Sequence, residues 1–216
     1  MKKEFAISGQ HYLFDVQVFA QTILTMGGEA YHYALRDRTT KGVISDVAAG
    51  DSELGVIMTT NKTHDALVGA IDKAGCELVA VAEGKPCVAV PNSHPLSNAK
   101  SLTLEDLADW PYVYFEQEDD APAEFFEECF GDQPRAKSIA LTDRASLSEL
   151  AAAINGYTVT SGILVGIADG GTLTTVPLES DAVLTLGYVQ KKGAELTDAG
   201  TRFVKTLAKQ LERYTR

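Results

Sequence analysis

Apolar and polar residues alternate with two different periods along the first 83 residues. Short apolar runs predict buried strands at 5–7, 31–35, 54–58 and 78–82. Apolar residues at helical spacing lie between these runs, and the three predicted helices end at Gly27, Gly50 and Gly75. Strands that alternate with helices in this way favour an α/β fold with a largely parallel sheet and right-handed crossovers.

The pattern breaks at Glu83-Gly84-Lys85-Pro86 and then restarts as a second α/β set. Further strands are predicted at 87–90, 112–115, 138–141 and 159–165. Two short helices are predicted at 102–107 and 124–130. A longer helix is predicted to begin after Thr142-Asp143 and to end at Asn155-Gly156.

A last strand, at 182–188, and a last helix follow the second set. Thr197 is the expected N-cap of this helix, which carries Phe203 and Leu207 on its apolar face. The second set does not need these elements, so we expect them to complete the first. The sequence therefore predicts lobe one at 1–83 plus 183–216 and lobe two at 84–182, joined by two crossovers.

The composition is that of an ordinary globular protein, with 45% hydrophobic and 23% charged residues. No apolar stretch approaches the roughly 18 residues of a membrane span, and no secretory signal is evident. We therefore expect a cytoplasmic protein without a membrane partner. The net charge of −11 argues against a basic face for nucleic acid. We interpret the acidic residues of 116–128 as a solvated surface.

Residues that commonly bind metals or carry catalysis are scattered along the chain. Cys76, Cys87 and Cys129 lie far apart without a Cys-x-x-Cys pair, and the four histidines occur singly. No Ser/His/Asp or metal-ligand cluster can be argued from this spacing. We therefore predict no metal site, no cofactor and no catalytic residue.

Three stretches, in this order, are similar to the effector-binding domain of LysR-type transcription regulators. The first, 46–56, is an apolar helix followed by a glycine, an acidic residue and a Leu-Gly-Val strand. The second joins the turn His94-Pro95-Leu96 to a Leu-Glu-Asp-Leu segment at 104–107 and to a strand led by Pro111. The third is the last helix, around 199–203. Together they extend the similarity over essentially the whole chain.

Two stretches depart from the family's pattern. Met26-Gly27-Gly28-Glu29 stands where the family often has a proline, and the glycine-rich passage at 156–162 lacks its usual final proline. These changes affect the fine shape of a pocket and not the fold. The family's N-terminal winged helix-turn-helix and linker helix are not found in this sequence. We expect that the DNA-binding half was removed and that Met1 is an added start.

The resemblance implies a type 2 periplasmic-binding-protein architecture of two Rossmann-like βα lobes. Such lobes clamp a small ligand in the cleft between them, and hinge motion reports its presence. The resemblance also implies a homodimer, with the helix near 42–49 at the contact, and a tetramer in the full-length protein. DNA is expected to bind only through the missing N-terminal domain. The expected function is therefore a ligand sensor for transcription regulation and not an enzyme.

The candidate effector-binding residues follow the carboxyl ends of predicted strands or lie in the glycine-rich passage. They are Ser8, Gly9, Gln10, Thr59, Thr60, Glu116, Gln117, Thr160 and Ser161. In a doubly wound sheet the carboxyl ends of the strands face the ligand crevice, and the family's ligand contacts map to the same places. The start of the first helix offers free N–H groups that suit a carboxylate. We expect a small polar metabolite with at most one or two negative charges, such as a carboxylic or amino acid.

Two other classes of protein share this architecture. A solute-binding protein of a membrane transporter would carry a signal sequence or a lipid-attachment cysteine near residue 1. A dehydratase-like enzyme would need a catalytic acid or hydroxyl in the cleft. Thr201-Arg202-Phe203 is similar to a signature of such enzymes, but it lies within the amphipathic last helix. Both alternatives are therefore less favoured than the regulator.

Overall fold

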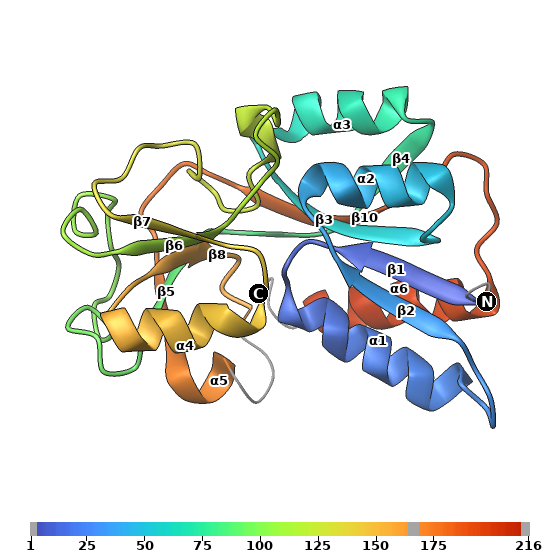
Figure 1. The fold of residues 1–216 in the computed structure, drawn as a ribbon, viewed down its shortest axis with the longest axis horizontal. Coiled ribbons are helices and arrows are strands. Elements are labelled where there is room, and N and C mark those ends of the chain that lie inside the picture. Colours follow the sequence, from blue (N-terminus) through green and yellow to red (C-terminus); the bar gives the residue numbers. More distant parts are fainter. Residues whose placement is uncertain (1–3, 164–168, 213–216) are drawn as a thin grey trace.

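The computed structural model describes residues 4–163 and 169–212, which form two lobes side by side (Figure 1). The chain leaves the first lobe between β4 (Cys76–Gly84) and β5 (Cys87–Pro91). It returns between β9 (Leu173–Pro177) and β10 (Leu184–Lys191). We propose 84–182 as the second lobe and the rest of the chain as the first.

The sheet of the first lobe has the strand order β2–β1–β3–β10–β4. β1 (Phe5–Gly9) pairs in parallel with both β2 (Tyr33–Asp37) and β3 (Leu54–Thr60). Every residue of β1 is buried, which explains why this strand is apolar almost throughout. β10 returns from the second lobe and lies antiparallel between β3 and β4. The expected α/β fold with a largely parallel sheet is confirmed, with β10 as the antiparallel member.

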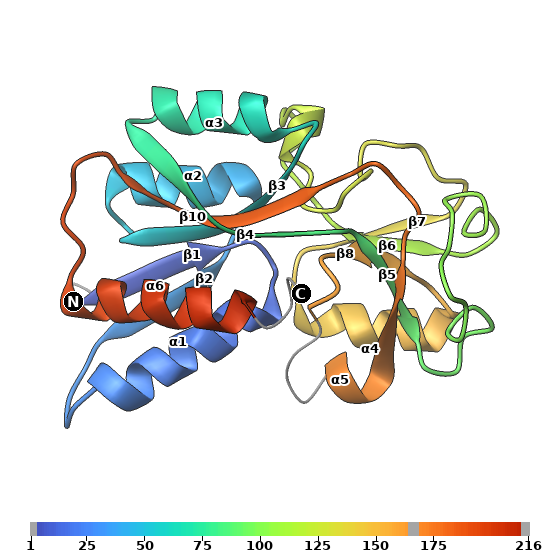
Figure 2. The ribbon, with the colours of Figure 1, turned by 180° about the vertical axis from the view of Figure 1, so that it is seen from behind.

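Helices cover both faces of this sheet (Figures 1 and 2). α2 (Thr40–Ala49) and α3 (His64–Lys73) lie on one face. α1 (Leu13–Met26) and α6 (Asp198–Leu211) lie on the other and pack against each other. None of the described helices has the length and apolar character needed to span a bilayer.

The last helix, α6, packs against α1 and β4. Thr197 caps α6, because its side-chain oxygen accepts a hydrogen bond from Gly200 N at 3.1 Å. Phe203 and Leu207 are fully buried, and the Phe203 ring lies 6.1 Å from the ring of Phe5 in β1. The two ends of the chain therefore share one core.

The second lobe is built on shorter strands. β5 lies between β8 (Thr158–Thr160) and β9 in an antiparallel sheet. β6 (Tyr112–Phe115) and β7 (Ser138–Leu141) form a parallel pair, which an isolated bridge from Tyr112 to Tyr157 joins to the β8 side. The described part of this lobe contains the 3-10 helix Ala123–Phe125, α4 (Ala145–Ile154) and the short α5 (Asp169–Thr172). Asp143 accepts a hydrogen bond from Ser146 N at 3.0 Å and so caps α4 at the predicted place.

The predictions of two helices in the second lobe are wrong. Residues 102–107 form turns in which Thr103 N–H and hydroxyl both donate to Asp106 Oδ2, so side-chain bonds replace helical ones. Residues 124–130 form only the end of a 3-10 helix and turns, because Phe126 is extended and Phe130 adopts a left-handed φ of 65°. The strand predicted at 159–165 is partly recovered as β8, while 164–165 lie outside the described residues.

The close contact of β10 with β4 gives a test of the packing. A Cβ on Gly187 would lie 2.4 Å from the backbone oxygen of Val79, where a strand register shift leaves no room to relax. Gly187→Ala should lower the free energy of unfolding by about 2 kcal/mol. Gly69→Ala, in α3 with nothing within 4 Å of the added carbon, should raise it by roughly 0.5–1 kcal/mol. Urea unfolding followed by circular dichroism measures both. Equal effects would mean that β10 does not pack against β4 as described.

Candidate ligand-binding site between the lobes

A small cavity of about 70 Å³ lies where the two lobes meet. The first lobe contributes the start of α1 and one residue of β3, and the second lobe contributes the end of β6, β8 and the start of α4. The lining residues are His11, Tyr12, Leu13, Phe14, Met58, Ala89, Phe115, Glu127, Glu128, Arg144, Leu147, Thr158, Val159, Thr160, Ser161, Ile163 and Leu173. The strand order of the first sheet reverses at β1, and doubly wound sheets hold ligands outside the carboxyl ends of strands at such a point.

Two of the candidate residues, Thr160 and Ser161, line this cavity. Thr160 ends β8, where it pairs with Cys87 of β5, and Ser161 follows it. Both side chains are partly exposed. They place two hydroxyl groups, each able to donate or accept a hydrogen bond, on the wall that the second lobe contributes.

Ser8, Gly9 and Gln10 lie at the end of β1 as expected but do not line the cavity. Ser8 is fully buried, and its hydroxyl bonds Asp46 Oδ2 at 2.6 Å and Ser52 Oγ at 2.8 Å within the first lobe. Alternate residues of a strand face opposite sides of the sheet, and Ser8 is on the side of α2. A Cβ on Gly9 would lie 2.1 Å from a carboxylate oxygen of Asp15, so glycine permits this close approach.

Gln10 joins three elements of the first lobe. Its Oε1 accepts hydrogen bonds from Met58 N at 2.8 Å and from the Tyr12 hydroxyl at 3.0 Å. Its Nε2 donates to Thr40 Oγ1 at 2.5 Å. The amide is therefore fully engaged in holding β1, β3 and α2 together.

The other four candidates lie around the cavity and not in it. Thr59 bonds His64 Nδ1 at 3.0 Å, and Thr60 bonds Thr63 Oγ1 at 3.2 Å, so both hydroxyls fix the start of α3. Glu116 is exposed and lines a neighbouring, more open hollow with Gln117. Gln117 bridges the lobes, because its Oε1 accepts from Thr40 N at 3.2 Å and its Nε2 donates to Glu127 at 3.2 Å.

Five ionisable residues that were not among the candidates line the cavity instead: His11, Tyr12, Glu127, Glu128 and Arg144. The interpretation of 116–128 as a solvated surface is wrong for Glu127 and Glu128, which are only 4% and 6% exposed. Their signal is weak in the sequence, because two acidic residues after a phenylalanine pair resemble the polar side of a helix. His11 directly follows Gln10 and could have been included with the end of β1.

His11 and Glu127 meet across the boundary between the lobes. Glu127 Oε1 lies 2.7 Å from His11 Nδ1, and Glu127 Oε2 accepts a hydrogen bond from His11 N at 2.9 Å. The His11 ring also stacks on Phe115 of the second lobe, with ring centroids 4.1 Å apart. The N–H groups just before α1 are the ones expected to hold a ligand carboxylate, and here they hold a carboxylate of the protein itself.

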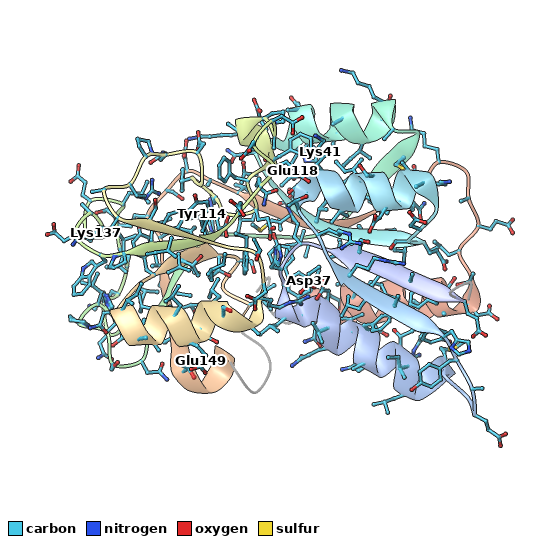
Figure 3. All side chains as sticks on the ribbon, in the orientation of Figure 1. Asp37, Lys41, Tyr114, Glu118, Lys137 and Glu149 are labelled. Carbon is cyan, nitrogen blue, oxygen red and sulfur yellow. The ribbon has the colours of Figure 1, made fainter. Side chains whose placement is uncertain are left out.

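Arg144 makes a second connection in the opposite direction, from the second lobe to the first. Its Nη1 lies 2.9 Å from Asp15 Oδ1 and also donates to the backbone oxygen of Tyr12. Its Nε donates to Asp37 Oδ2 at 3.2 Å, and its Nη2 pairs with the other oxygen of Asp37. Figure 3 shows Asp37 at the boundary between the lobes. The guanidinium therefore joins two carboxylates and a carbonyl of lobe one.

A third set of contacts lies at the start of α2, where Figure 3 shows Lys41 and Glu118 close to each other. Thr39 Oγ1 donates to Glu118 Oε1 at 2.5 Å, and Lys41 Nζ pairs with Asp120 at 3.0 Å. Lys41 and Asp120 are exposed, so this pair contributes little to stability. Glu118 places negative charge at the N-terminus of α2, where the helix dipole favours it.

Burial raises the pKa of two side chains that line the cavity, Glu128 and Tyr12. The pKa of Glu128 is held well above its ordinary value by burial and by Glu127 beside it. The pKa of Tyr12 is raised by burial and by the nearby carboxylates, Glu127 first among them. Within residues 4–163 and 169–212, no three side chains of the usual ligand types gather to hold a metal ion.

Asp15 gives a pH-dependent prediction. Its burial raises the pKa, Arg144 and His11 oppose this, and the result is a pKa of about 6 against 3.8 in the unfolded chain. The folded protein therefore keeps this proton longer than the unfolded chain, and stability falls as pH rises from about 4 to about 6. Asp15→Asn cannot titrate. Its free energy of unfolding relative to the parent should rise by about 3 kcal/mol between pH 4 and pH 7. Urea titrations at each pH measure this, and a pH-independent difference would contradict it.

The chain matches the LysR substrate binding domain family over residues 32–212. No match was found among the curated protein sequences. Several solved structures share the fold at low sequence identity. HinK, a LysR family transcriptional regulator from Pseudomonas aeruginosa, is 15% identical with a TM-score of 0.62, over 96% of this chain and 70% of that one.

Two regulatory domains solved on their own are similar over nearly their full length. The effector binding domain of QuiR in complex with shikimate is 12% identical, with a TM-score of 0.64 over 98% of both chains. The reduced OxyR regulatory domain from Pseudomonas aeruginosa is 13% identical, with a TM-score of 0.63 over 97% of this chain and 96% of that one. The chain therefore belongs to the LysR substrate binding domain family, the effector-binding regulatory domains of LysR-type transcription regulators.

Proposed function

We propose that the cavity between the lobes is the effector site of this domain and that occupancy is signalled by a change in the angle between the lobes. One observation carries the proposal: charged and polar side chains from both lobes converge, buried, on a cavity at the reversal point of the sheet. A ligand there touches both lobes at once. It can therefore bind the protein more tightly at one angle between the lobes than at another. Such a difference in affinity shifts the conformational equilibrium.

The proposed effector is a small polar metabolite. Hydroxyls of Thr158, Thr160 and Ser161 and a largely apolar remainder line the cavity, which suits a compact molecule with few hydrogen-bonding groups. QuiR, of the same fold, was solved with shikimate. The expected carboxylate contact at the start of α1 is less favoured here, because Glu127 already takes the donors of His11.

The family favours a regulator over both alternatives. Domains of this family bind effectors and are not normally enzymes. Thr201-Arg202-Phe203 lies in α6 with Phe203 buried in the core of the first lobe and Arg202 exposed, so this motif is far from a catalytic arrangement. The solute-binding protein shares the lobes but not the family match.

Blocking the cavity tests the proposed site. A library of small metabolites that includes shikimate is screened by thermal shift, and hits are titrated by calorimetry. Thr160→Phe should weaken each hit at least tenfold, because the larger side chain fills the space. Thr201→Phe, on the exposed side of α6, should leave the affinities unchanged. Hits that bind Thr160→Phe as tightly as the parent would place the effector elsewhere.

We also propose a homodimer, as part of a tetramer in a full-length regulator. Within the described residues, the large apolar side chains that are exposed gather at the end of α1 and before β2: Leu24 at 87%, Tyr31 at 43% and Met26 at 37%. The helix expected at the contact, α2, exposes Lys41, Ser45 and Ala49 instead. An apolar patch is the better dimer contact, so the end of α1 replaces α2 in this proposal.

Sedimentation velocity at micromolar concentrations tests the dimer. Leu24→Glu should shift the parent's dimer toward monomer by at least tenfold in the dissociation constant. A charge of the same kind on α2, Ser45→Glu, should have little effect. If Ser45→Glu disrupts the dimer and Leu24→Glu does not, the dimer contact lies at α2 and not at the end of α1.

A further inference from the structure

The described walls of the cavity leave no base free to receive an anion. Among the described residues that line it, Arg144 and His11 are the bases. Arg144 is already bonded to Asp15, Asp37 and a backbone oxygen, and His11 is bonded to Glu127. An anionic ligand would need to displace one of these carboxylates, while a cation would add charge of the missing sign.

Glu127 already fills the place of a ligand carboxylate. Its two oxygens are bonded to three groups: the backbone N–H of His11, the His11 ring and the amide of Gln117. Glu127 is 4% exposed, so this arrangement is part of the packed boundary between the lobes. The donors that would hold an acid ligand are therefore satisfied without one.

Glu128 is different, because one of its oxygens has no partner. Its Oε1 accepts a hydrogen bond from Phe115 N at 2.8 Å, while its buried Oε2 bonds no group in the described chain. The residue lines the cavity and is only 6% exposed. Leaving a buried carboxyl oxygen unpaired costs free energy, which a donor on a ligand would recover.

We infer that the effector carries a protonated amine or a similar cationic nitrogen group, and that Glu128 receives it. The inference rests on the proposed function, that the cavity between the lobes is the effector site. The aromatic side chains of Tyr12 and Phe14 add walls that attract a cation more than an anion. Leu147, Ile163 and Leu173 supply apolar surface for a short hydrocarbon body. The ligand class is therefore a compact organic amine.

The titration of Glu128 gives this inference a signature of its own. The groups that face it are Glu127, Tyr12 and Tyr112, none of which supplies positive charge, and its pKa is raised well above the ordinary value. An ammonium group beside it favours the carboxylate, so the affinity for an amine rises as pH rises through the raised pKa of Glu128. A carboxylate ligand would raise this pKa further, so its affinity would fall over the same range.

Matched probes test the charge preference. Benzylamine, benzyl alcohol and benzoate share one skeleton, and butylamine, butanol and butanoate share another. Each is titrated at pH 7 by calorimetry, and amide NMR shifts of Phe115, Thr160 and Ser161 report whether it enters the cavity. We expect each amine to bind in the cavity at least tenfold more tightly than its alcohol and its acid. Calorimetry repeated at lower and higher pH should show an amine affinity that rises with pH, while the alcohol affinity stays unchanged.

Variants assign the effect to Glu128. Glu128→Gln keeps the shape of the side chain and should weaken amine binding at least tenfold while leaving the alcohols unchanged. Glu105→Gln, in an exposed turn of the second lobe, is the matched control and should bind the amines like the parent. Circular dichroism checks that Glu128→Gln folds. If it does not, the rise of the parent's amine affinity with pH still tests Glu128.

The outcomes separate the inference from the proposed function. If no probe of any charge shifts the amide NMR signals of the cavity residues, the proposed effector site itself is overturned. An acid or alcohol that enters the cavity as tightly as its amine would keep the site and overturn the amine. Amine affinity that does not rise with pH, or that is unchanged in Glu128→Gln, would overturn Glu128 as the receiving group.

Discussion

The guanidinium of Arg144 is the contact on which the arrangement of the two lobes depends. Two crossovers join the lobes, and a pair of strands can bend without breaking many hydrogen bonds. Side-chain contacts therefore decide the angle between the lobes. Arg144 comes from the start of α4 in lobe two, yet its partners Asp15 and Asp37 lie in lobe one. If the lobes separated, Asp15 would remain buried in α1 without its counter-charge, which is strongly unfavourable.

Such an ion pair sets geometry more than it adds stability. Burial of Asp15 costs so much that its pKa stays raised to about 6 even with Arg144 beside it. Hydrophobic residues at the same positions would pack without this cost, but they would not select one angle between the lobes. Glu127, which is bonded across the boundary to His11, also fixes the angle between the lobes more than it adds stability. Buried charges between the lobes therefore favour one angle between them more than they add stability.

Sequence patterns predicted the scaffold better than the site. Continuous burial of β1 and β3 produces apolar runs, and the Thr197 cap and the αL residue Asn155 mark helix ends by local chemistry, so these features are readable without a structure. Turns at 102–107 and 124–130 were missed because side-chain bonds of Thr103 and the left-handed Phe130 override the helical pattern.

The site was harder to predict because it depends on which way side chains turn where the lobes meet. Thr160 and Ser161 could be placed from the passage after the long helix, since β8 brings them to the boundary. Ser8 follows the same rule of strand ends but turns toward Asp46, because Asp46 and Ser52 offer it two partners inside the lobe. Glu127 and Glu128 carry no periodic signal, since their burial results from contacts with residues more than ten positions away in the sequence.

The acidic boundary also limits what an effector can do to the angle between the lobes. A ligand shifts the equilibrium only by the difference in its affinity for the two arrangements. Glu128 and Phe115 come from the second lobe, while Tyr12 and Leu13 come from the first, so a compact ligand touches both only when the lobes are close together. A compact ligand that enters this cavity therefore favours the arrangement in which the two lobes are close together.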